Sequence, residues 1–130
     1  DLAQIVVRIA HQNRIRAVIG PPNSVLRKVA LEAGLDFVAE GFADRQYSSD
    51  GSLVPRSEPG SVLTSVQEQV AQVLHISEEG CVTARDGSMI SLPVETICLH
   101  GDTAGAIQSA LGIREALQTR KIEIKAHLPQ

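Results

Sequence analysis

Two short apolar segments of this sequence each end in side chains that could carry out acid–base chemistry. Glu40 and Asp44 lie at the end of the first segment, and His100 and Asp102 directly follow the second. Carboxylates and an imidazole are groups that proteins use to move a proton or activate water near neutral pH. Because Glu40 stands within an otherwise apolar strand, its carboxylate needs a polar partner, which favours a functional role. We predict that these four side chains form the catalytic part of a polar site.

Three further polar side chains follow the first segment and could hold a substrate. A guanidinium such as that of Arg45 binds a carboxylate or phosphate through paired hydrogen bonds. Tyr47 and Arg56 flank a turn of Ser, Asp and Gly residues, 48–52, from which they could fold over a bound molecule. We predict that Arg45, Tyr47 and Arg56 bind the substrate. A solvated loop, with Asp44 capping a turn and Arg45 in a surface ion pair, is the alternative.

The second segment also has a purely structural explanation. Asp102 could cap a helix beginning at Thr103, and His100 could be a core histidine with its hydrogen bonds satisfied. Cys98 lies two residues before His100, on the same side of a strand, which raises the idea of a Cys–His nucleophile. A buried, unreactive Cys98 is the stronger interpretation. Cys81 and Cys98 show no metal-ligand spacing, so we predict no metal site and reduced thiols.

The spacing of apolar residues predicts which elements position these side chains. Apolar residues recur every three to four positions in helices and at alternate positions in half-buried strands. We expect helices at 2–11, 25–33, from 57–61 to about 74, and 103–117, and strands at 14–19, 35–42, 81–84, 89–92, 96–100 and 122–126. Such alternation predicts an α/β fold with mainly parallel strands. Both polar segments follow strands, and ligand sites in these folds lie at the carboxyl ends of strands.

Length and composition restrict the class of protein. A chain of 130 residues, 43% of them hydrophobic, suffices for one domain with a core, and we expect residues 1–130 to form one. The net charge of −3, without a basic block, argues against a nucleic-acid partner. No apolar run reaches the roughly 20 residues that span a bilayer, so we expect no membrane partner and a cytoplasmic location. The sequence also lacks a Walker-type phosphate-binding loop.

Three blocks of the sequence, in this order, resemble the LamB/YcsF family. They are Glu-Gly-Phe-Ala-Asp-Arg at 40–45 with the following Tyr47, Asp50-Gly51 and Leu53, then Arg56 with Pro59-Gly60, then Ile-Cys-Leu-His-Gly-Asp-Thr at 97–103. Members of this family resemble an irregular (β/α) barrel of the glycoside hydrolase/deacetylase type, and they are roughly twice as long as this chain. The resemblance implies that residues 1–130 are the C-terminal half of such a barrel.

The family resemblance also implies an enzymatic activity. Members supply one of the subunits, designated A, of the ATP-dependent 5-oxoprolinase, which cleaves 5-oxo-L-proline to L-glutamate while ATP is hydrolysed. ATP, with Mg²⁺, is then a co-substrate, no tightly bound cofactor is expected, and subunits B and C are the implied partners. Arg45 or Arg56 would hold the substrate carboxylate or a phosphate, and the four acid–base side chains would manage the proton or water.

The sequence permits two other interpretations. A barrel of this type also suits a metal-assisted deacetylase or glycosidase-like carbohydrate hydrolase, with a divalent metal ion at His100 and Asp102. Alternatively, the chain is a non-catalytic piece that only docks with partner subunits, because a piece lacking the rest of the pocket would be inactive alone.

Overall fold

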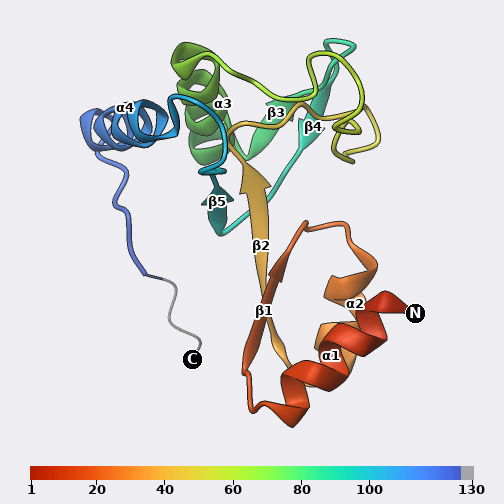
Figure 1. The fold of residues 1–130 in the computed structure, drawn as a ribbon. Helices are drawn as coiled ribbons and strands as arrows, with labels where there is room; N and C mark the ends of the chain where they lie inside the picture. The colour runs from red at the N-terminus through yellow and green to blue at the C-terminus, as the bar shows by residue number, and fades with distance from the viewer. Residues whose placement is uncertain (127–130) are drawn as a thin grey trace.

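The computed structural model describes residues 1–126 as a mixed fold of helices and strands (Figure 1). In chain order its elements are α1 (Leu2–Gln12), β1 (Ala17–Gly20), α2 (Val25–Glu32), β2 (Asp36–Phe42), α3 (Val66–Glu79), β3 (Cys81–Thr83), β4 (Met89–Ser91), β5 (Thr96–Cys98) and α4 (Ala106–Thr119). In Figure 1, α1 and α2 lie together beside β1, whereas α3 and α4 lie near the carboxyl end of β2. The predicted α/β class is confirmed.

Three parallel strands form the sheet that carries the candidate site. Their order is β1-β2-β5, so the central strand β2 has a neighbour on each side. β1 pairs with the first part of β2. β5 pairs with the last part, where Glu40 lies opposite Thr96 and Phe42 opposite Cys98. Within residues 1–126 the sheet does not close into a barrel. The parallel pairing brings the ends of β2 and β5 to the same edge of the sheet.

A separate antiparallel hairpin, formed by β3 and β4, packs against α3. In its turn, Gly87 has a positive φ of 86°, and Asp86 accepts hydrogen bonds from the backbone and hydroxyl of Ser88. α3 ends at Gly80, which has a φ of 65° and redirects the chain into β3. Glycine adopts this left-handed conformation without the steric cost that other residues incur.

Small apolar clusters, built from aliphatic side chains and the two phenylalanines and the tyrosine, hold these elements together. One cluster packs α1 and α2 on the first part of the sheet, with Val7, Ala10, Ala30 and Leu35 buried. A second packs the hairpin on the end of β2, with Tyr47, Ile76, Val82 and Leu92 buried. A third joins α3, α4 and β5, with Ala43, Val73 and Leu117 buried. Two of the clusters therefore surround the segment that follows β2.

Two predicted helix starts are wrong, both in glycine-containing loops. The helix expected to open at 57–61 begins at Val66, because Gly60 has a positive φ of 72° that a helix does not allow, and Ser65 caps the true start. The helix expected from Thr103 begins at Ala106 after a left-handed Gly105, without a side-chain cap. Asp102 is therefore not the cap of this helix.

The strand expected at 122–126 is also wrong, because the described chain forms no strand there. The Ile122 backbone N–H donates to the Leu117 carbonyl at 2.9 Å, and the Ile122 side chain packs against the third apolar cluster. Ile122 is the packed residue of this alternating pattern, because Ile124 is 60% exposed and Ala126 is also exposed. Residues 127–130, at the end of the chain, lie outside the described residues. Among residues 1–126, no helix has the length and apolar character needed to span a membrane.

Close packing of α4 on α3 requires glycine at position 112. A Cβ atom built on Gly112 would lie 2.9 Å from Val66 Cγ1, which is too close without a shift of the helices. We expect Gly112→Ala to lower the free energy of unfolding by about 1–3 kcal/mol in urea titrations, although alanine is the better helix former by about 1 kcal/mol. In a Val66→Ala background the same change should be neutral or stabilising. Equal losses in both backgrounds would contradict the packing explanation.

Candidate functional site

Asp44 and His100 meet at the shared edge of β2 and β5. The Nδ1 atom of His100 lies 2.9 Å from each carboxylate oxygen of Asp44, and the His100 backbone N–H donates to Asp44 Oδ2 at 3.2 Å. Asp44 is 2% exposed, whereas the His100 side chain is 26% exposed. Because the carboxylate holds Nδ1 as the protonated nitrogen, Nε2 is left with a lone pair. The pair has the arrangement of a general base and the carboxylate that orients it.

The same face of the sheet also carries Glu40, Phe42 and Cys98. Alternate residues of a strand point to one face, so Glu40 and Phe42 precede Asp44 on one strand, and Cys98 precedes His100 on its neighbour. The rings of Phe42 and His100 are stacked, with centroids 5.9 Å apart and an angle of 11° between their planes. This packing fixes the imidazole plane in addition to the hydrogen bonding of His100 to the Asp44 carboxylate.

Glu40 lines a cavity of about 360 Å³ beside this pair. The cavity lies between the start of α2, the loop after β2 and the hairpin, and its other lining residues are Pro21, Pro22, Asn23, Ser24, Phe42, Tyr47, Asp50, Gly51, Ser52, Leu53 and Leu92. Its volume falls within the range of small-molecule sites in proteins. Phe42 borders the cavity and stacks on His100, so the cavity and the Asp44–His100 pair adjoin each other.

Cys98 does not have the surroundings of a nucleophile. Burial, followed by the negative charges of Glu40 and Asp44, raises the pKa of the Cys98 thiol above its ordinary value. A raised pKa keeps the sulfur protonated and unreactive, because the thiolate is the attacking species. Cys98 is half-buried rather than fully buried as expected, and the raised pKa of its thiol argues against a role as half of a Cys–His pair.

Tyr47 is buried against the end of β2. Its hydroxyl accepts a hydrogen bond from the Phe42 backbone N–H at 2.9 Å, and the residue is 3% exposed. Burial raises the pKa of the phenol to about 12, and the nearby Glu40 adds to this effect. The hydroxyl therefore keeps its proton at neutral pH and lies at the wall of the Glu40 cavity.

Arg45 is buried and holds the loop that follows β2. Its Nη2 donates to the Val54 carbonyl at 2.7 Å, and its Nε donates to the Ser61 carbonyl at 3.4 Å. The residue is 7% exposed, so this guanidinium is not in a surface ion pair. Substrate binding by Arg45 stays a prediction, and the contacts that the structure describes for it position the loop between residues 46 and 61.

Arg56 and Asp102 face each other across the outer part of the site. Arg56 Nη1 lies 3.7 Å from Asp102 Oδ2, and the two side chains are 51% and 69% exposed. In the sequence, Asp102 is the carboxylate nearest to His100 and would be the simplest candidate to orient the imidazole. The structure assigns that position to Asp44, from the neighbouring strand. The Arg56–Asp102 pair instead connects the loop after β2 with the loop after β5.

Gln72 is a positioning residue that the sequence did not indicate. Its side-chain amide on α3 donates to the carbonyls of Phe42, Ala43 and Arg45, at 2.8, 3.3 and 2.9 Å. These carbonyls flank Asp44, so Gln72 fixes the backbone that carries the carboxylate. A glutamine on the half-buried side of a helix is common, so its residue type does not mark it as functional. The one signal in the sequence is that a polar residue stands among the apolar positions of α3.

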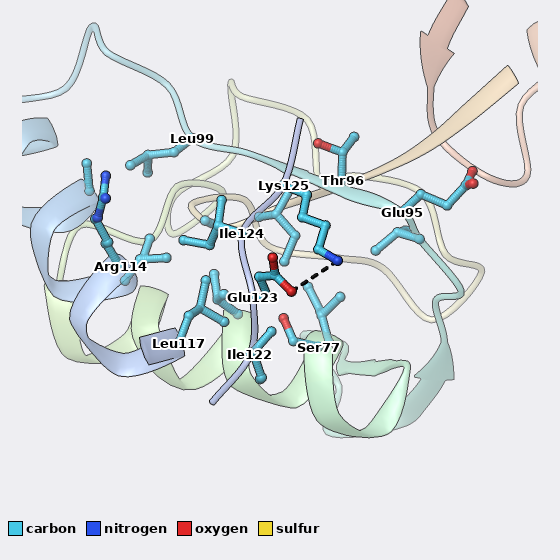
Figure 2. Close-up of a pocket in the computed structure, with 17 residues that line it drawn as sticks. Ser77, Glu95, Thr96, Leu99, Arg114, Leu117, Ile122, Glu123, Ile124 and Lys125 are labelled. Carbon is cyan, nitrogen blue, oxygen red and sulfur yellow. Dashed lines mark ion pairs between the residues drawn. The ribbon is translucent and has the colours of Figure 1, made fainter. Parts of the chain in front are cut away.

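A larger cavity than the one at Glu40 lies on the opposite face of β5, away from these side chains. It has a volume of about 470 Å³ and is bordered by α3, α4 and residues 122–125. Figure 2 shows that aliphatic side chains such as Leu99, Leu117 and Ile122 line it, beside an ion pair of Glu123 and Lys125. Leu99 alternates with Cys98 and His100 along the chain, which explains why this groove is apolar and the other face is polar.

The fold and this polar edge define an α/β protein with a candidate acid–base site, and comparison with known proteins identifies its family. The profile of the LamB/YcsF family matches residues 1–130. The chain belongs to the LamB/YcsF family, as its sequence blocks suggested.

Individual relatives support this assignment. The A subunit of 5-oxoprolinase from Streptomyces coelicolor is 47% identical over 109 residues, which cover 84% of this chain and 44% of that protein. The corresponding 5-oxoprolinase subunit from Haemophilus influenzae (strain PittEE) is 38% identical over 126 residues, covering 96% and 51%. The crystal structure of a lactam utilization protein from Thermus thermophilus superimposes with a TM-score of 0.87 at 32% identity, covering 96% of this chain and 50% of that one. The chain spans about half the length of these relatives.

The raised pKa of Tyr47 predicts a loss of stability in alkali. Below the ordinary phenol pKa of 10.0, the folded and unfolded chains both hold this proton. Between pH 10 and pH 12 the folded chain holds it more tightly, so the stabilisation from the buried phenol is lost over this range. We expect the wild type to lose about 2–3 kcal/mol more unfolding free energy than Tyr47→Phe between pH 9 and pH 12. Parallel pH profiles of the two proteins would contradict a buried, protonated Tyr47.

Proposed function

We propose that this chain contributes the hydrolytic site of a 5-oxoprolinase, which converts 5-oxo-L-proline and ATP to L-glutamate, ADP and phosphate in the cytoplasm. The observation that carries the proposal is the Asp44–His100 pair at the edge of the Glu40 cavity. The names of the relatives, which refer to 5-oxoprolinase and to lactam utilization, support a cyclic amide as the substrate. Subunits B and C, implied by the letter A in the names of the 5-oxoprolinase relatives, are the proposed partners.

The proposed chemistry explains why the site needs an oriented imidazole. A lactam carbonyl is a poor electrophile, and transfer of a phosphoryl group from ATP to its oxygen would make the ring carbon easier to attack. His100 Nε2 would remove a proton from the attacking water, while Asp44 stabilises the imidazolium that forms. The ring C–N bond then breaks and the nitrogen takes up the proton, which leaves an acyl phosphate. A second water attacks the acyl carbon, the bond from this carbon to the phosphate oxygen breaks, and phosphate leaves with the former carbonyl oxygen.

Arg56 is the better of the two candidate arginines for the substrate carboxylate. Its guanidinium is half exposed and shares only a 3.7 Å ion pair with Asp102, whereas Arg45 is buried and engaged with loop carbonyls. An incoming carboxylate could replace or join Asp102 at Arg56. Glu40, on the wall of the cavity, is proposed to accept the lactam N–H and to guide the leaving amine.

ATP, with Mg²⁺, enters this proposal as a co-substrate. The chain has no Walker-type loop, and we assign the phosphates of ATP to no residue of this chain.

The alternative function, a metal-assisted carbohydrate hydrolase, needs His100 and Asp102 as joint ligands of one metal ion. Within residues 1–126, His100 pairs with Asp44 and Asp102 with Arg56, and these side chains are not part of a three-ligand cluster. This arrangement favours the proposed hydrolysis of a cyclic amide over the metal-assisted reaction.

We expect substitution of either Asp44 or His100 to cause a large loss of activity, and the effects of the two substitutions not to add. In the full protein assembled with its partner subunits, we expect Asp44→Asn and His100→Gln each to lower 5-oxoproline-dependent ATP hydrolysis about 10²–10⁴-fold. The double variant should be little worse than either single variant, because the two residues act as a unit. His11→Asn, on the exposed side of α1, is the matched control and should retain activity. Full turnover in both site variants, with normal assembly, would favour a docking role instead.

Substitution of Arg56 is expected to change the affinity for the substrate rather than the turnover rate. We expect Arg56→Ala to raise KM for 5-oxoproline at least about tenfold with a small change in kcat, because it removes binding that substrate and transition state share. Arg8→Ala, also an arginine but on α1, should leave both constants unchanged. An unaltered KM in Arg56→Ala would remove Arg56 from substrate binding while leaving the role of His100 intact.

A further inference from the structure

Three potential metal ligands converge at the junction of α3 and β3, among residues that the proposed reaction does not use. His75 Nε2 lies 3.3 Å from Cys81 Sγ and 3.4 Å from Glu79 Oε2. The three ligand atoms all lie within 4.8 Å of one another. His75 and Cys81 are half-buried, whereas the Glu79 side chain is 65% exposed, so an ion from solvent can reach the cluster.

The fold brings these residues together by ordinary local rules. His75 and Glu79 are four residues apart on α3, so they lie on one face of its last turn. Gly80, in the left-handed conformation, then reverses the chain and returns Cys81 toward that face at the start of β3. Pairing of Cys81 with Ser91 in the hairpin holds the thiol in place. The cluster is therefore fixed by a helix end and a strand rather than by a loose loop.

The geometry points to a site for one transition-metal ion of borderline softness, such as Zn²⁺, and we propose that His75, Glu79 and Cys81 bind it. In a tetrahedral zinc site, the bond lengths to nitrogen, sulfur and oxygen place neighbouring ligand atoms about 3.4–3.6 Å apart. The two distances from His75 Nε2 are close to these values. Binding would replace the thiol proton, which passes to solvent, and water would fill the fourth position.

Hydrogen bonding alone accounts for this cluster less well. One ring nitrogen has a single in-plane position, so Nε2 either donates one hydrogen or accepts one. Here both a sulfur, at 3.3 Å, and a carboxylate oxygen, at 3.4 Å, compete for that position, and the distance to the oxygen is longer than that of a strong hydrogen bond. A cation at the centre would satisfy all three groups at once. Imidazole and thiolate ligands favour Zn²⁺ or Co²⁺ over Mg²⁺ or Ca²⁺, which prefer oxygen.

Cobalt(II) titration of the full chain tests the proposal, because a thiolate bound to Co²⁺ gives a charge-transfer absorption band. We expect one equivalent of Co²⁺ to bind with this band, and Zn²⁺ to displace it. Cys81→Ser should abolish the band, and His75→Asn should weaken binding at least about tenfold. Glu78→Gln is the matched control, because Glu78 neighbours Glu79 but pairs with Arg120. Absence of the band in the wild type, or its persistence in Cys81→Ser, would overturn the proposal.

A second measurement needs no variant and so does not depend on whether a variant folds. Alkylation of the two cysteines in the wild-type chain can be followed separately by mass spectrometry, with and without Zn²⁺. We expect Zn²⁺ to slow alkylation of Cys81 at least about tenfold and to leave the rate at Cys98 unchanged. Equal protection of both thiols, or protection of neither, would contradict a metal site at Cys81.

Discussion

The parallel pairing of β2 with β5 is the constraint on which the candidate site depends. Phe42 lies opposite Cys98, and the backbone N–H of Ala43 donates to the Cys98 carbonyl at 2.9 Å, which continues the ladder past the end of β2. Asp44 and His100 each follow this last pair by two residues, so both point to the same face and come within hydrogen-bond distance. A slip of one residue in either strand would turn one of them to the apolar face.

The sequence could predict which strand ends carry the polar side chains, because apolar runs and turn residues define strands without knowledge of their partners. It could not predict which carboxylate orients His100, because that depends on strand order. Asp102 is nearest in sequence, but Asp44, 56 positions away, is the partner. Arg45 shows the same limit: its type suggests an anion, whereas burial directs its N–H groups to loop carbonyls. The type of a residue indicates which partners its side chain can bind, and the packing of the fold decides which of these partners it contacts.

The two helix starts that the sequence misplaced share a physical cause. The start of α3 and the start of α4 follow glycines at positive φ, where local backbone conformation overrides a helical pattern. The segment 122–126 alternates like a strand but pairs with no strand among residues 1–126, and its Ile124 is 60% exposed. The His75–Cys81 cluster escapes notice for a related reason. Residues six apart do not share a face of a helix, and His75 and Cys81 come into contact because Gly80 ends α3 between them and turns the chain into β3.

Helix α3 connects features that would otherwise be independent. Within one turn it places Gln72 on the carbonyls around Asp44, Val73 in the apolar cluster and His75 in the proposed metal site. Successive helical positions point in different directions, so a single turn can contact three surroundings at once. The proposed metal site and the amide that holds the backbone around Asp44 therefore share one turn of α3.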